Sequence, residues 1–218
     1  MNVIVTLGNP FDVYTNTRHN VAATYFDYVA KKYSAKVSET ISNDSTYVDI
    51  IDQLISFTKK HYALDDSENF NVGKSIPIYR SFIFNSTMFM RPMLGMNSSG
   101  IAFEHLINNN TIDKMTVLCD DIDLDFGVLK MKAKCSKTHH NGLKSIKSSI
   151  KNAFSYIRIG IGKPDCDVLD YVLNEFNAKE MNKLPIVLEH IDCVVQKIVN
   201  NSSVDSVIQY CNTMKVVS

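Results

Sequence analysis

The chain has 218 residues, 45% of them hydrophobic, which is enough for one well-filled domain, with two small domains as the alternative. Lysine plus arginine and aspartate plus glutamate number 23 each, so no global electrostatic field favours nucleic acid or a membrane, and charge recognition must come from local asymmetry. The five cysteines contain no CxxC pair, which argues against a disulfide framework or a cysteine zinc site.

The start of the chain shows no targeting pattern, and no apolar run approaches the roughly 18 residues that span a bilayer. We therefore expect a cytoplasmic protein without a membrane partner.

The first predicted element is a buried strand over residues 2–7, which meets the turn signal Gly8-Asn9-Pro10. Apolar residues then recur at helical spacing, which predicts a helix that begins near 17–20 and runs to about 33. His19 would lie in the first turn of this helix.

Residues 36–75 are predicted to form an acidic insertion or long excursion, with a possible helix over 48–57. Two strands are predicted within 77–91, on either side of Asn85-Ser86. A loop at 96–100 then leads into a helix.

The second half begins with a buried strand over 115–119, followed by four aspartates: Asp120, Asp121, Asp123 and Asp125. Apolar residues alternate with lysines over 128–134, which predicts a strand with one basic face. The remaining predicted elements are helices at 142–151, 177–200 and 203–213 and a strand at 156–161.

This alternation of strands and helices predicts an α/β fold, with a single domain built on a mixed, mostly parallel sheet and helices on both faces. Ligands of such sheets bind at the carboxyl ends of the strands. Asn9, Asn97 and Asp120 follow apolar strands or lie in the loops they feed, so we expect them to converge.

The aspartate cluster suggests calcium first, but the EF-hand pattern fails. Phe126 replaces the glycine of the turn, and Lys132 occupies the position of the bidentate glutamate. We predict no metal and no cofactor, and solvated turn acids at Asp121 and Asp125.

Three histidines, His19, His139 and His140, are candidates for a general base. A lone histidine is more often structural than catalytic. His19 is favoured because a helix N-terminus disfavours imidazolium, while a carboxylate such as Asp120 would orient the ring and stabilise the charge it gains with a proton. No Gly-x-Ser-x-Gly elbow or cysteine nucleophile signature is present, so attack by water is preferred to a covalent intermediate.

Residues 128–164 contain nine basic residues and no acid. This region, which includes Lys130, Lys132 and Arg158, could hold phosphates, and a solvated basic face is the alternative.

Five motifs follow one another in a fixed order along the chain. They are Leu7-Gly8-Asn9-Pro10 with Tyr14 and Thr17-Arg18-His19-Asn20; Pro92 with Met96-Asn97 and Ser99-Gly100; Asp120-Asp121-Ile122-Asp123-Leu124 with Gly127; His140-Asn141-Gly142-Leu143-Lys144-Ser145-Ile146; and Arg158-Ile159-Gly160-Ile161-Gly162 with Pro164. Together with Asp170-Tyr171-Val172-Leu173 they resemble the bacterial-type peptidyl-tRNA hydrolases over the whole chain except roughly 36–90.

The resemblance implies hydrolysis of the ester between a peptide and the 3′ end of tRNA, by a monomer without a metal. By this resemblance His19 would activate water, Asp120 would orient His19, and Asn9 would position the substrate carbonyl. The implied substrate-binding residues are Tyr14, Met96, Asn97, His140 and Asn141. The implied contacts to tRNA phosphate are Lys130, Lys132 and Arg158.

The chain departs from the family pattern at Phe11, Ala22, Leu94-Gly95, Thr138-His139 and Tyr156. The loss of glycines before His140 restricts the backbone there. Two alternatives stay open: a non-catalytic RNA-binding relative of the same fold, and a different small hydrolase or scaffold that uses the acidic insertion.

Overall fold

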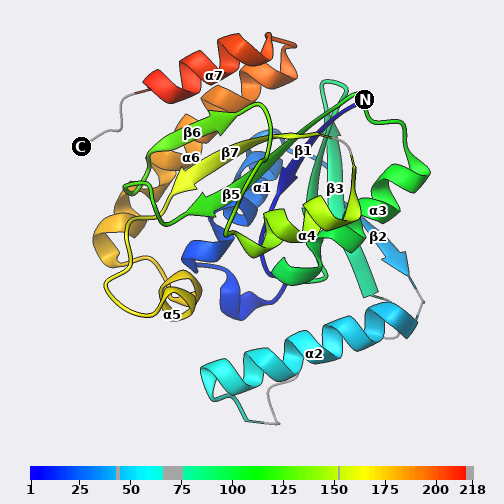
Figure 1. Cartoon of the computed structure of the whole chain (residues 1–218), viewed down its shortest axis with the longest axis vertical. Coiled ribbons are helices and arrows are strands. Elements are labelled where there is room, and N and C mark those ends of the chain that lie inside the picture. The colour runs from blue at the N-terminus through cyan, green and yellow to red at the C-terminus, as the bar shows by residue number, and fades with distance from the viewer. Residues whose placement is uncertain (43–44, 66–75, 152, 215–218) are drawn as a thin grey trace.

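The computed structural model describes residues 1–42, 45–65, 76–151 and 153–214. One seven-stranded sheet in the order β2-β3-β4-β1-β5-β7-β6 runs through it (Figure 1). The strands are β1 (Asn2–Thr6), β2 (Ser38–Ser42), β3 (Ile76–Phe84), β4 (Thr87–Pro92), β5 (Lys114–Asp121), β6 (Leu129–Lys132) and β7 (Ser155–Gly160).

The four central strands β4, β1, β5 and β7 are parallel, and antiparallel strands complete both edges. This confirms the predicted α/β fold with a mixed sheet. Because β1 and β5 are parallel neighbours, with Thr6 paired to Leu118, the loops that follow them leave the sheet side by side.

Helices cover both faces of the sheet (Figure 1). The α-helices are α1 (Val21–Lys32), α2 (Ser45–Tyr62), α3 (Ser99–Asn109), α4 (Asn141–Ser149), α5 (Val168–Leu173), α6 (Ala178–Val199) and α7 (Val204–Thr213). Three 3-10 turns add η1 (Asp12–Tyr14), η2 (Arg18–Asn20) and η3 (Met96–Ser98).

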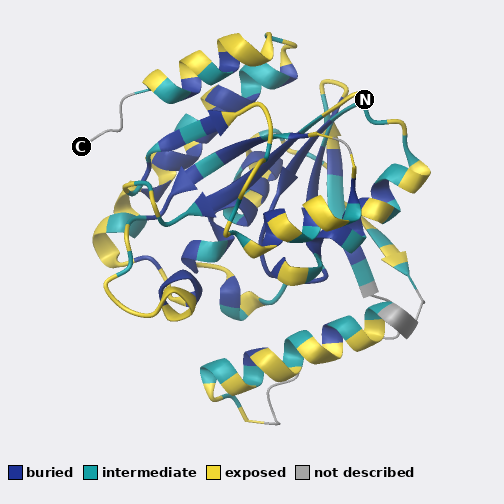
Figure 2. Cartoon of the chain, viewed as in Figure 1, coloured by how far each residue is buried: buried dark blue, intermediate teal, exposed yellow. Residues whose placement is uncertain are grey.

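Alternate residues of β1 point to opposite faces and join two separate apolar clusters. Ile4 packs with residues of α1 and α6, whereas Val3 and Val5 pack with residues of α3 and α4. The sheet therefore divides the core into two layers of side chains, and the ribbon at the centre of the molecule is coloured as buried in Figure 2.

Helix α1 is held to α6 by a buried polar cluster. Asp192 of α6 accepts hydrogen bonds from the hydroxyls of Tyr25 and Tyr33 and from Lys32 Nζ. Buried carboxylates persist when several donors satisfy them. This cluster fixes the helix that follows His19.

Most predicted elements are confirmed. The helix predicted from 177 begins with a capping box formed by Asn177 and Glu180. Asn85 and Ser86 both have positive φ, as the predicted turn between β3 and β4 requires.

Two elements were not predicted. Strand β2 lies at a sheet edge and pairs only with β3, so most of its side chains are exposed and the apolar alternation of a covered strand is missing. Helix α5 has six residues, too few for a clear helical period.

The helix predicted over 48–57 is confirmed and extends over all of α2. It lies at one end of the sheet (Figure 1), and its Ile51 joins the apolar cluster that contains Val3 and Val5. The 66–75 part of the predicted acidic insertion lies outside the described residues. No helix among the described residues is long and apolar enough to span a membrane.

Candidate active site

His19 lies in the 3-10 turn η2, immediately before α1. The sequence predicted that His19 lies in the first turn of the helix, but in the structure the α-helix begins two residues later, at Val21. Buried Arg18 anchors η2, because its guanidinium donates to the carbonyl of Glu175 and to the carboxylate of Glu180. The neighbouring His19 side chain is left 12% exposed.

Asp120 is the last but one residue of β5, and its side chain is 4% exposed. Its Oδ1 atom lies 2.8 Å from Nδ1 of His19 and 2.9 Å from Nε2 of His140. The two imidazole centroids are 5.1 Å apart. The fold thus brings two imidazoles, 101 and 20 residues away from Asp120 in the sequence, to one oxygen of its carboxylate.

Protonation at this cluster follows from the contacts. Burial opposes ionisation of Asp120, but the neighbouring imidazoles and their hydrogen bonds outweigh it and hold the pKa of this carboxyl below its ordinary value. A carboxylate only accepts hydrogen bonds, so His19 Nδ1 and His140 Nε2 must both carry protons. The Leu143 N–H donates to His140 Nδ1, which agrees with a proton on the other nitrogen.

The second nitrogen of His19, Nε2, therefore keeps its lone pair in the neutral ring. A nitrogen in this state can accept a proton, while Asp120 stabilises the imidazolium that forms. The arrangement is that of a general base with its orienting acid.

The same three residues offer ligand atoms within 4.8 Å of one another, which is close enough to hold a metal ion. Coordination at the nitrogens that face Asp120 would require both to lose their protons. His140 would then have to carry its proton on Nδ1, where the Leu143 N–H already points. The hydrogen-bond pattern thus favours a proton-transfer cluster.

Asn9 lies beside this cluster in the loop after β1. Its Oδ1 accepts from the backbone N–H of Met96, so its Nδ2 is turned the other way. No acceptor for this Nδ2 occurs among the hydrogen bonds of the described residues. Asn9 is buried as a residue, and its Nδ2 is a donor available to a carbonyl oxygen of a ligand.

Two residues to which the sequence analysis gave no role, Asn20 and Arg91, fix the backbone of Asn9. The Asn20 side chain accepts from the Asn9 N–H at 2.7 Å and donates to its carbonyl oxygen at 3.0 Å. Arg91 of β4 also donates to that carbonyl and pairs with Asp27 of α1. The long sequence separations of these contacts left no local signal for Arg91.

Met96 and Asn141 belong to the same region. A Cβ on Gly142 would lie 2.6 Å from Met96 Sδ and 3.2 Å from His140 Cε1, so any larger residue here would displace the Met96 side chain. Asn97 in η3 and Asn141 at the start of α4 are exposed. Their side chains can reach a ligand, whereas the buried Met96 lines the wall between them.

Tyr14, expected to bind substrate, is fully buried. Its ring stacks against Phe11, one of the departures from the family pattern. Its hydroxyl lies 2.7 Å from Thr58 Oγ1 of α2. Tyr14 therefore lies behind the site loop and does not face the exposed edge of the cluster.

The three predicted phosphate contacts differ in their surroundings. Arg158 lies opposite Lys130 in the β6–β7 pair and donates to the Asp121 carboxylate at 3.0 Å. The Lys130 ammonium donates to the carbonyl of Asn212 in α7. Lys132 is exposed and has no polar partner among the described residues, so it is the cation most available to a ligand.

The Thr138-His139 departure is accommodated without displacing the cluster. Thr138 Oγ1 accepts the backbone N–H of His140 at 3.2 Å, and His139 is exposed.

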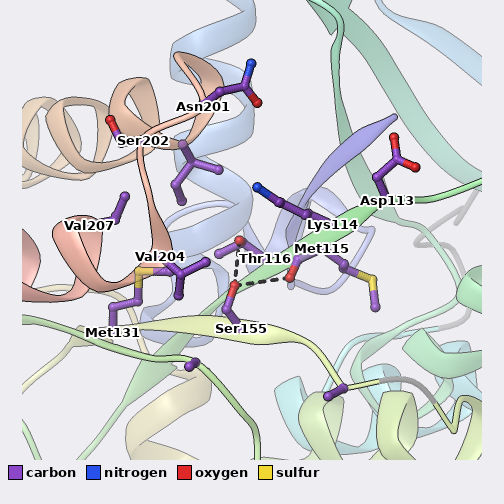
Figure 3. Close-up of a pocket in the computed structure, with 13 residues that line it drawn as sticks. Asp113, Lys114, Met115, Thr116, Met131, Ser155, Asn201, Ser202, Val204 and Val207 are labelled. Carbon is purple, nitrogen blue, oxygen red and sulfur yellow. Dashed lines mark hydrogen bonds between the residues drawn. The ribbon is translucent and has the colours of Figure 1, made fainter.

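A shallow pocket of about 190 Å³ lies at the amino-terminal ends of β5 and β7, away from this cluster (Figure 3). Its polar groups Thr116 and Ser155 bond to each other, and Ser155 also donates to the Met115 carbonyl. The hydroxyl hydrogens of Thr116 and Ser155 are therefore already used within the protein.

A mixed sheet with an imidazole–carboxylate cluster at the carboxyl ends of its parallel strands is the arrangement of an α/β enzyme. A family model described as Peptidyl-tRNA hydrolase matches residues 3–217. The chain therefore belongs to the peptidyl-tRNA hydrolase family, a family of enzymes.

The chain is similar to individual members over its length. A relative from Fusobacterium nucleatum named peptidyl-tRNA hydrolase is 32% identical over 100% of both chains, and one from Caldicellulosiruptor bescii is 34% identical over 97% of both. The crystal structure of peptidyl-tRNA hydrolase from Acinetobacter baumannii superimposes with a TM-score of 0.70 and 24% identity, covering 99% of this chain and 96% of that one. This likeness supports the fold.

Proposed function

We propose that the protein hydrolyses the ester between the peptide and the 3′-terminal ribose of peptidyl-tRNA, without a metal ion. Family membership supports the substrate. The observation that carries the mechanism is the bond between His19 Nδ1 and Asp120, which leaves His19 Nε2 as the available base.

In the proposed reaction, His19 Nε2 takes a proton from a water molecule whose oxygen attacks the ester carbonyl carbon. Asp120 holds the ring and stabilises the imidazolium. The Asn9 Nδ2 group donates to the carbonyl oxygen as it gains negative charge. Collapse of the tetrahedral intermediate breaks the bond to the ribose oxygen, which takes the proton from His19. The products are the peptide carboxylic acid and tRNA with a free hydroxyl.

We assign the tRNA and peptide contacts to the residues around this centre. Lys132 and Arg158 would bind a tRNA phosphate, with Lys130 in a secondary role because its ammonium is already bonded to α7. Asn97, Asn141 and His140 would contact the peptide and the terminal nucleotide. By the family resemblance the protein would act as a cytoplasmic monomer.

The decisive experiment compares purified wild type with His19→Ala on N-acetyl-aminoacyl-tRNA, with release of the acid as the readout. Wild type should turn over and the variant should lose about 10²–10⁴ in kcat. Equal activity of both would overturn the base assignment. Tight tRNA binding with no wild-type turnover would identify a non-catalytic RNA-binding relative instead.

A further inference from the structure

Helix α2 belongs to the insertion that has no counterpart in the family motifs, yet it packs directly on the loops of the active site. Thr58 is fully buried, and its Oγ1 donates to the Leu54 carbonyl at 2.7 Å. The Tyr14 hydroxyl must then donate to Thr58 Oγ1. One side of α2 is thus bonded to the loop that leads to His19.

A second contact joins α2 to the loop that carries Met96. Gly95 has φ of +84°, and Leu54 Cδ2 lies 2.8 Å from where a Cβ on Gly95 would be. Leu54 therefore fills the space beside this residue. Ile51, one turn earlier, is buried in the same apolar cluster as Met96.

The order of the strands decides which side of the substrate faces α2. Arg158 lies on β7 and Lys132 on β6, Asp120 lies near the end of β5, and Asn9 and Met96 follow β1 and β4. If tRNA phosphate binds at β7 and β6 and the ester lies at β5, the peptide extends past β1 and β4. Helix α2 stands on that side (Figure 1).

The side of α2 that faces Gly95 continues as an apolar stripe. Leu54, Phe57 and His61 have i, i+3, i+7 spacing and so share one side of the helix. Phe57 is 41% exposed, and its ring stacks on His61 at 5.8 Å. Leu54 and the exposed Phe57 ring, which lies against the His61 imidazole, give this side of α2 an apolar surface that suits an apolar ligand.

We propose that this stripe is a specificity wall for the peptide part of the substrate, on which Phe57 contacts an apolar side chain of the peptide upstream of its C-terminal residue. This inference rests on the proposed function. It predicts that substitutions in α2 change KM for substrates with long apolar peptides and leave the recognition of tRNA and of the ester unchanged.

The test measures kcat and KM on one tRNA that carries either a single N-acetylated amino acid or an N-acetylated apolar tetrapeptide with the same C-terminal residue. Phe57→Ala should raise KM for the tetrapeptide substrate about five-fold, the size expected for a lost aromatic contact, with kcat unchanged. KM for the single-residue substrate should stay constant. Phe57→Leu should keep most of the affinity, and Ser56→Ala, an exposed change on another side of α2, should behave as wild type.

Because Phe57 is partly exposed, the variant should fold, and its unfolding temperature provides the check. An equal rise of KM for both substrates would show a general structural effect and would contradict the proposed peptide contact. An unchanged KM for the tetrapeptide substrate would also contradict it. Failure of wild type to hydrolyse either substrate would overturn the proposed function, and this inference with it.

Discussion

His19 Nδ1 and Asp120 Oδ1 are 2.8 Å apart, and this contact determines which nitrogen of the imidazole can act as a base. Since the ionised carboxylate accepts a hydrogen bond from the Nδ1–H group, Nε2 is left to receive a proton from water. In the proposed mechanism the acid therefore acts on the base and makes no contact of its own with tRNA.

Asp120→Asn should therefore lower kcat by about 10²–10⁴ and change KM little, because the amide neither enforces the tautomer nor stabilises imidazolium. Steady-state kinetics on peptidyl-tRNA measure both constants. Asp125→Asn is the matched control, since Asp125 is exposed in the same acidic segment. Parallel losses of kcat and tRNA affinity would contradict the orienting role.

The His140 side chain has two separable contacts, one to Asp120 and one as the N-cap of α4. His140→Ala should lose both, with a fall in kcat and a loss of about 1 kcal/mol in the free energy of unfolding. Asparagine is a good N-cap but is too short to reproduce the imidazole, so His140→Asn should recover the stability and leave kcat low. Recovery of kcat together with stability would mean that the cap alone matters.

Local sequence patterns were sufficient for most strands and helices and for the convergence of Asn9 and Asp120 at one edge of the sheet. They could not place His140 on the oxygen that His19 also contacts, because that geometry depends on how α4 packs against η3 through Gly142. They also could not show that Tyr14 would be covered by Thr58. Contacts between distant segments produce no periodic pattern in the sequence. The segment around α2 is polar in composition, so its buried side could not be recognised from the sequence.

The depressed pKa of Asp120 gives a dependence of stability on pH. A carboxyl whose pKa is lower in the folded than in the unfolded chain contributes fully above the unfolded value, about 3.9, and loses its contribution as pH falls through the folded pKa. The free energies of unfolding of wild type and Asp120→Asn, measured in urea, should therefore differ most above about pH 4, and the difference should shrink as pH falls below that value. A difference that is constant or grows on acidification would contradict the charged pair.

Lys130 and Lys132 form a matched pair for the proposed phosphate contact. They alternate along β6, but only Lys130 is bonded to the Asn212 carbonyl. Lys132→Ala should raise KM, leave kcat unchanged and reduce the slope of log affinity against log salt by about 0.7–0.9, as expected when one phosphate contact is lost. Lys130→Ala should change the slope less and lower the unfolding temperature instead, because it removes a cation from the C-terminal end of α7. The affinity is measured by competition with deacylated tRNA at several salt concentrations. Equal slopes for wild type and Lys132→Ala would show that Lys132 makes no phosphate contact.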